Sequence, residues 1–186
     1  SVIAVLEDRK ATVNSLIDVG DGSVTYYNRT MKDVHRFRVS TVTLREVFEE
    51  SSTVGISKLI TSAYSSDPQA FVDWLRGMSL DKPLGVEIPG EGKPYIKDPS
   101  DKEYWYGTSP PWMSVGYEVS LTPLQMLTFY NAVANNGVMV KPMFVKEIQD
   151  GGSTLQKNGT VATYGGMGIR PDDEGARAAA TAARVG

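Results

Sequence analysis

The sequence predicts an α/β chain that is mainly helical. Capped apolar segments with helical spacing dominate it, short segments of strand character lie between turn residues, and one long irregular segment separates two helical regions. The contents of 41% hydrophobic and 22% charged residues are ordinary for a globular protein. A length of 186 residues suits one domain with a core.

The first elements are a helix, a strand and a second helical region. The apolar run Val2–Leu6 reads as a helix already in progress, so we expect that the chain has been truncated upstream. Residues 23–27 have strand character. Thr43 and Glu46 form a capping-box pattern, and residues 54–63 follow with approximate helical spacing.

The next helix is predicted from Asp67, an N-cap residue, to Gly77, a stop signal. Residues 80–111 are rich in Pro, Gly, Asp and Lys and predict a long irregular loop. A further helix is expected from a capping box at Thr122 and Gln125 to Gly137, and its apolar residues cover more than one stripe. We therefore expect that helix to be buried on two sides.

The end of the chain changes in character. Segments 144–148 and 154–157 flank Asp150-Gly151-Gly152, which is a hairpin pattern. The sequence then becomes rich in Gly and Ala. The predicted organisation is a partial domain over residues 1–160 and, over residues 161–186, a loose tail or sequence added by cloning.

Composition argues against several functions. The net charge is -3 and no large basic cluster occurs, which argues against nucleic-acid binding. The absence of cysteine excludes disulfides and thiolate metal sites. His35 is the single histidine, and we interpret it as a loop or surface residue rather than a metal ligand. No motif implies a cofactor, and no apolar run approaches the ~20 residues of a membrane span.

The most informative segment is Ser51-Ser52-Thr53, a short turn between two helices. By residue chemistry alone, helix capping is favoured over catalysis here. The segment nevertheless resembles the S-x-N motif region of penicillin-binding protein transpeptidases. Residues 112–125 resemble that family's glycine turn and T-P-x-Q helix, residues 134–142 resemble the helix end and next strand, and residues 89–91 match its P-G-E. The pieces stand in family order.

The resemblance implies a partial penicillin-binding protein and serine β-lactamase-like fold. Members cross-link peptidoglycan stem peptides through an acyl-enzyme and bind penicillin and other β-lactams. The parent protein is expected at the periplasmic face of the bacterial inner membrane, with division or elongation proteins as partners. Two alternatives stay open: a non-catalytic interaction module of the same fold, and a D,D-carboxypeptidase or β-lactam sensor.

The resemblance also assigns residues to roles. Ser51 is expected to be the proton-relay serine, and Thr53 stands where the family has Asn, whose planar amide a hydroxyl replaces only in part. Ser52, Gly116 and Tyr117 are expected to bind substrate. No metal ligand is expected.

Two of the three family motifs are missing from the sequence. The one S-x-x-K match begins at Ser79 and ends at Lys82, but Pro83 follows and the match lies after the S-x-N region, so we interpret it as accidental. No Lys is followed by Ser or Thr and then Gly, so the strand that holds the substrate carboxylate is absent. The chain alone is therefore expected to be inactive and to self-associate through apolar surface left uncovered.

Overall fold

The computed structural model of the chain describes residues 1–157 and 163–166. Its helices are α1 (Val2–Glu7), α2 (Leu44–Glu49), α3 (Thr53–Tyr64), α4 (Pro68–Gly77), α5 (Ser109–Ser114) and α6 (Pro123–Ala134). Its strands are β1 (Leu16–Asp18), β2 (Ser23–Tyr26), β3 (Arg29–Lys32), β4 (Thr41–Thr43), β5 (Tyr95–Ile96), β6 (Val119–Ser120), β7 (Val138–Val140), β8 (Glu147–Asp150), β9 (Ser153–Lys157) and β10 (Thr163–Gly166). The chain is thus mixed α/β.

The strands form small sheets rather than one large sheet. Every sheet in the described part has two antiparallel strands, and the pairs are β1 with β4, β2 with β3, β5 with β6, β7 with β10, and β8 with β9. Two-stranded sheets are marginal on their own, so they depend on the helices for support.

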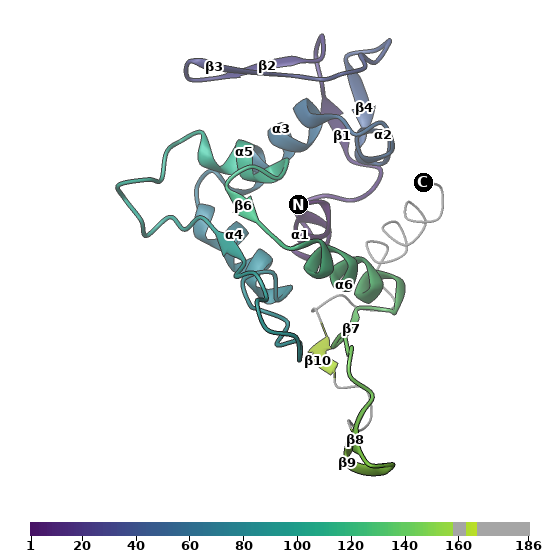
Figure 1. Cartoon of the computed structure of the whole chain (residues 1–186). Coiled ribbons are helices and arrows are strands. Elements are labelled where there is room, and N and C mark those ends of the chain that lie inside the picture. The colour runs from purple at the N-terminus through teal and green to yellow at the C-terminus, as the bar shows by residue number, and fades with distance from the viewer. Residues whose placement is uncertain (158–162, 167–186) are drawn as a thin grey trace.

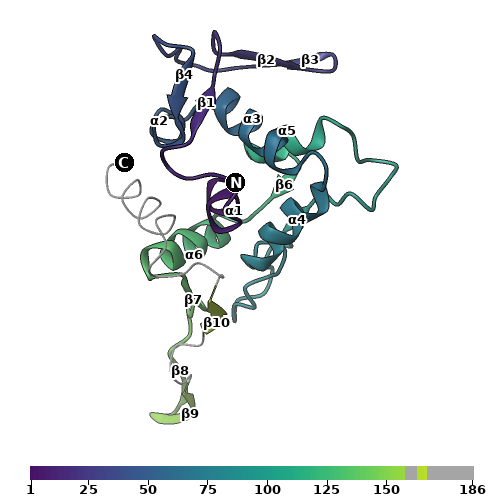
Figure 2. The ribbon, with the colours of Figure 1, turned by 180° about the vertical axis from the view of Figure 1, so that it is seen from behind.

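The core lies among the helices. In both views α1 occupies the middle of the molecule, with α3, α4 and α6 around it (Figures 1 and 2). Val5, Ile60 and Phe71, from three of these helices, are each 0% exposed, and the side chains of Tyr64 and Phe71 pack with ring centroids 5.5 Å apart. The β2–β3 hairpin projects at one end and the β8–β9 hairpin at the other.

The predicted helix starts are confirmed. Thr43 begins α2 with a capping box: its hydroxyl accepts from the amide of Glu46, whose carboxylate accepts from the Thr43 amide. Because the Thr43 amide and hydroxyl both donate to this carboxylate, the pKa of Glu46 lies below its usual range. Thr122 and Gln125 begin α6 in the same way, and the Asp67 side chain accepts from the first turn of α4.

Several elements differ from the prediction. The loop expected over residues 80–111 holds β5 and the start of α5, and β3 pairs with the predicted β2 strand. The helix α6 is not buried on two sides: Leu127 and Tyr130 are 66% and 52% exposed. That prediction was wrong because apolar residues on a helix do not show whether a neighbouring element covers them. Ser79 has a positive φ of 57° and Lys82 lies outside any helix, which agrees with an accidental S-x-x-K match.

Acidic side chains hold the long loop in place. Both carboxylate oxygens of Glu91, in the P-G-E segment, accept backbone N–H groups, from Leu84, Gly85 and Val86. Farther along, the Arg76 guanidinium lies 2.5 Å from Asp98. Hydrogen bonds from Ser100, and then the Arg76 contact, lower the pKa of Asp98 below its usual value.

The division of the chain at residue 160 falls largely outside the described residues. Thr163–Gly166 do pair with β7, so residues beyond 160 contribute a strand to the fold. Residues 167–186, which make up most of the expected tail, lie outside the described part. No helix in the described residues has the length and apolar character to cross a membrane.

The open face of α6 leads to a prediction for the isolated chain. We expect concentration-dependent self-association through Leu127 and its neighbours, because burying a leucine side chain stabilises by about 1.5–3 kcal/mol. Leu127→Glu should weaken it roughly tenfold or more in sedimentation equilibrium. Leu155→Glu, at an equally exposed leucine (67%) on β9, is the matched control and should have little effect. Monomeric sedimentation of the unmodified chain across a wide concentration range would contradict the prediction.

Candidate functional site

The Ser51-Ser52-Thr53 turn borders a hollow of about 300 Å³. The opposite wall comes from the start of α1 and the end of α5, including Val2, Ser114 and Val115. Val47 and Phe48 of α2 and Ile56 of α3 complete the lining. Segments far apart in sequence therefore meet here, and the turn from the resembling motif is part of the wall.

Ser51 is the most available hydroxyl on this wall. It is exposed, and its backbone has a positive φ of 52°, a conformation that costs a non-glycine residue energy. Its N–H donates to the carbonyl of Phe48, but its side-chain hydroxyl has no hydrogen-bond partner among the described residues. The expected relay serine is thus presented to the hollow with both its proton and its lone pairs free.

Ser52 is built differently. Its side chain is the N-cap of α3, where it accepts from the N–H of Gly55 at 2.9 Å. The same hydroxyl donates to the carboxylate of Asp33 at 2.7 Å, and the residue is only 2% exposed. Capping, which residue chemistry alone favoured, is therefore present at Ser52. A substrate-binding role for this residue stays a prediction.

Thr53, the first residue of α3, is tied to the end of the β2–β3 hairpin. Its hydroxyl lies 3.0 Å from Oδ1 of Asp33 and 3.2 Å from the carbonyl oxygen of Lys32, and it donates toward both. The N–H of Val54 also donates to Oδ1 of Asp33, at 2.9 Å. The free amides at the start of α3 are thereby satisfied within the chain.

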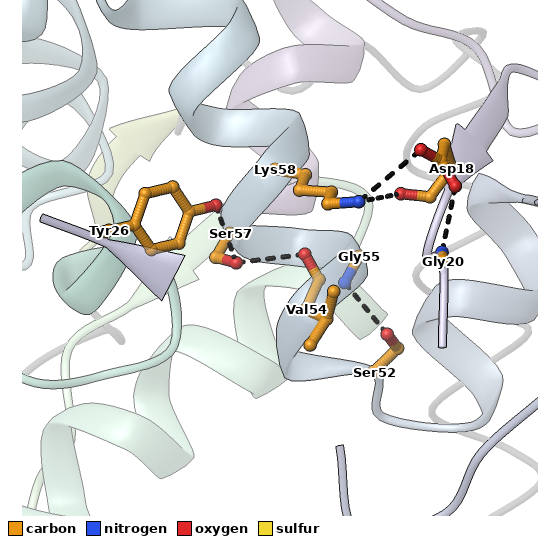
Figure 3. Close-up of polar contacts among 8 residues, drawn as sticks. All are labelled: Asp18, Gly20, Tyr26, Ser52, Val54, Gly55, Ser57 and Lys58. Carbon is orange, nitrogen blue, oxygen red and sulfur yellow. Dashed lines mark hydrogen bonds and ion pairs between the residues drawn. The ribbon is translucent and has the colours of Figure 1, made fainter. Parts of the chain in front are cut away.

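Polar contacts on the next turn of α3 fix the helix itself (Figure 3). The hydroxyl of Tyr26, on β2, donates to Ser57, which in turn donates to the carbonyl of Val54. Farther along the helix, Lys58 donates to the backbone carbonyl of Asp18 and forms an ion pair with its carboxylate. Strands β1 and β2 therefore hold α3, and with it the turn at its start.

Gly116 and Tyr117 lie beside the hollow rather than in its wall. They follow Ser114 and Val115, which do line it. Gly116 has a positive φ of 100°, which suits glycine, and the Tyr117 side chain is 63% exposed. Their expected substrate contacts stay a prediction.

The hollow supplies hydroxyls but no general base. None of its lining residues carries a titratable side chain, and a serine hydroxyl needs an adjacent base to act as a nucleophile. The described residues also contain no group of three or more metal-ligating side chains. The wall can therefore pass a proton or orient a bound group, while the attacking residue and its base must come from other residues.

Sequence reasoning missed Asp33, which lies about 20 residues before the turn that it contacts. No local pattern links a carboxylate in one hairpin to a helix N-terminus so far along the chain. Ser57 had a weak signal, since a serine among apolar helix positions is often buried and bonded.

Comparison with known proteins gives a consistent result. A family model described as penicillin binding protein transpeptidase domain matches residues 1–167. The penicillin-binding protein PbpB of Mycolicibacterium smegmatis is 32% identical over 158 residues, which cover 85% of this chain and 22% of PbpB. The peptidoglycan D,D-transpeptidase FtsI of Escherichia coli is 30% identical over 118 residues, 63% of this chain and 18% of FtsI. The chain thus spans about a fifth of these relatives' length.

Solved structures agree in fold. Penicillin-binding protein 3 of Mycobacterium tuberculosis, complexed with aztreonam, superposes with a TM-score of 0.73 at 27% identity, over 97% of this chain and 37% of that one. A peptidoglycan glycosyltransferase from Burkholderia ambifaria gives a TM-score of 0.76 at 22% identity, over 97% of this chain and 51% of that one. The fold of the described residues is therefore that of a transpeptidase domain.

Proposed function

Because this chain belongs to the penicillin-binding protein transpeptidase domain family, we propose that it forms one wall of the active site of a peptidoglycan D,D-transpeptidase. The observation that carries the proposal is the free hydroxyl of Ser51, which borders a hollow at the family's S-x-N position. The nucleophilic serine and its lysine would lie in a part of the protein that this sequence does not include. The chain alone would then be inactive.

In the proposed reaction, the nucleophilic serine attacks the carbonyl of the terminal D-Ala-D-Ala bond of a stem peptide. The lysine takes the serine proton, the peptide bond breaks, and D-Ala leaves as an amine after it receives a proton. The amine of a second stem peptide then attacks the acyl-enzyme, which releases the serine. Ser51 would relay protons between the lysine and the leaving or entering amine, a role that needs a hydroxyl free to donate and accept.

The proposed partners follow from this reaction. Stem peptides would be donor and acceptor, and β-lactams would acylate the same serine, as their presence in structures of penicillin-binding protein 3 suggests. The FtsI relative supports a role in cell division, with division proteins as partners and a location at the periplasmic face of the inner membrane.

Labelled penicillin tests this proposal directly. We expect the longer protein that carries this segment to form a covalent penicillin adduct, and the isolated chain to form none. In the longer protein, Ser51→Ala should slow acylation by about 10²–10⁴-fold, the usual contribution of a positioned proton-transfer group. Ser153→Ala, on the exposed β9 strand, is the control and should acylate normally. An adduct on the isolated chain, or none on the longer protein, would contradict the proposal.

One observation favours a second candidate, a non-catalytic interaction module with the same fold. Thr53 replaces the family's Asn, and its hydroxyl is engaged by Asp33 rather than left for a substrate. A longer protein that folds but forms no penicillin adduct would support this candidate. If an adduct forms and is then hydrolysed without transfer to an amine, the activity is instead that of a D,D-carboxypeptidase, or of a β-lactam sensor if it persists.

A further inference from the structure

The contact between Asp33 and the start of α3 has a chemical consequence at Thr53. A threonine hydroxyl has one proton to donate and two lone pairs with which to accept. Both groups near the Thr53 hydroxyl, the Asp33 carboxylate at 3.0 Å and the Lys32 carbonyl at 3.2 Å, are acceptors. The proton of Thr53 is therefore directed at the hairpin, and only a lone pair remains for the hollow that this residue also lines.

The same carboxylate fixes the geometry of the turn. Asp33 accepts from the Ser52 hydroxyl, the Thr53 hydroxyl and the Val54 N–H, which belong to three consecutive residues. Hydrogen bonds to a charged acceptor are about twice as strong as neutral ones. They hold the residues that directly follow Ser51, whose positive φ of 52° is an unfavourable conformation that needs support from its surroundings.

Helix capping alone does not require this arrangement. Ser52 already caps α3 by accepting from Gly55, and a cap of that kind needs no partner beyond the helix. With Asp33 bound as well, the start of α3 has no free amide for an anionic ligand at Val54 or Gly55. The site at Thr53 is thus suited to a donor rather than to an anion.

We propose that Asp33 is a positioning residue of the active site, which makes Thr53 an acceptor for an N–H donor in the hollow. The donor would be an ammonium or amide N–H of the reacting groups. Asn in the family can donate and accept with one side chain, whereas Thr53 held by Asp33 can only accept. This inference rests on the proposed transpeptidase function and assigns a role to the residue by which this chain departs from the motif.

The test is a double-mutant cycle in the longer protein, with the rate of acylation by labelled penicillin as the readout. Asp33→Asn keeps the shape of the side chain but adds an N–H₂ donor, so the Thr53 proton is no longer held. We expect acylation to slow by roughly 10- to 100-fold, since a displacement of about 1 Å in a positioning group can cost about 100-fold. Thr53→Val should slow it similarly, and Thr53→Ser, which keeps the hydroxyl, should retain most of the rate.

Coupling separates positioning from simple structural support. If Asp33 acts through Thr53, the double variant Asp33→Asn/Thr53→Val should acylate about as fast as Thr53→Val alone. Asp18→Asn is the matched control, because Asp18 also supports α3, through Lys58, but does not touch the turn. It should acylate at the normal rate. Thermal unfolding of each variant shows whether it is folded.

The outcomes are distinct. If the unmodified longer protein forms no adduct, the proposed function itself fails. If it forms one and Thr53→Val acylates at the normal rate, the role of Thr53 as acceptor is overturned, even where Asp33→Asn does not fold. Independent, multiplicative effects of Asp33→Asn and Thr53→Val would overturn the action of Asp33 through Thr53.

Discussion

Gly55→Ala should lower the free energy of unfolding by about 2 kcal/mol, although alanine is normally the better helix residue. A Cβ at Gly55 would lie 2.6 and 2.7 Å from the two methyl carbons of Val47 and 3.0 Å from Oγ of Ser52. Val47 is fully buried and has one strongly preferred rotamer in a helix, so it cannot move aside without strain. Helices α2 and α3 would have to separate, and the turn between them includes Ser51.

Chemical denaturation measures this effect, and the chain offers a matched control. Gly77, the last residue of α4, has no atom within 4 Å of the position that a Cβ would take. Gly77→Ala should therefore be neutral or slightly stabilising. In the Gly55→Ala background, Val47→Ala removes the clashing methyl groups and should cost less than it does alone. A Gly55→Ala chain as stable as Gly77→Ala would show that α2 and α3 are less closely packed than this structure has them.

The second large effect is expected at the ion pair between Lys97 and Glu118, which joins the long loop to the Gly116 turn. The Lys97 ammonium lies 2.9 Å from Oε1 of Glu118, and the two side chains are only 10% and 25% exposed. Lys97→Met would leave the carboxylate without its counter-charge. Removing one partner of a buried pair typically costs about 3–5 kcal/mol, and we expect about 3 kcal/mol because Glu118 keeps some contact with solvent.

Removing the second charge should restore part of this loss. The double variant Lys97→Met/Glu118→Gln has no uncompensated charge, so it should be more stable than Lys97→Met alone in urea denaturation. Asp73→Asn is the control: Asp73 lies 3.8 Å from Arg76 on the exposed face of α4. Surface pairs of that kind contribute about 0–1 kcal/mol. A loss at Lys97 no larger than the loss at Asp73 would contradict the expected role of the pair.

Local chemistry made much of the fold predictable. The capping boxes at Thr43 and Thr122 and the cap at Asp67 join atoms three residues apart, so their signals stand together in the sequence. The β8–β9 hairpin follows the Asp150-Gly151-Gly152 turn for the same reason, although β8 begins at Glu147 rather than at residue 144. The family was predicted from motifs whose order along the chain is itself a property of the sequence.

Contacts between distant segments were not predictable in this way. The pairing of β1 with β4 and the short α5 helix carry no local signal that distinguishes them from loop. The open face of α6 was wrongly expected to be covered, because apolar content does not reveal which neighbours a helix has.

By itself, the sequence determined the helix starts, the family, and the presence of Thr53 where that family has Asn. Only the tertiary structure decided what Ser51 and Thr53 can do. It leaves the Ser51 hydroxyl free beside the hollow and directs the Thr53 proton to Asp33, 20 residues away along the chain. The physical reason is that a hydroxyl is a donor or an acceptor according to what lies within about 3 Å of it, and folding alone brings those atoms together.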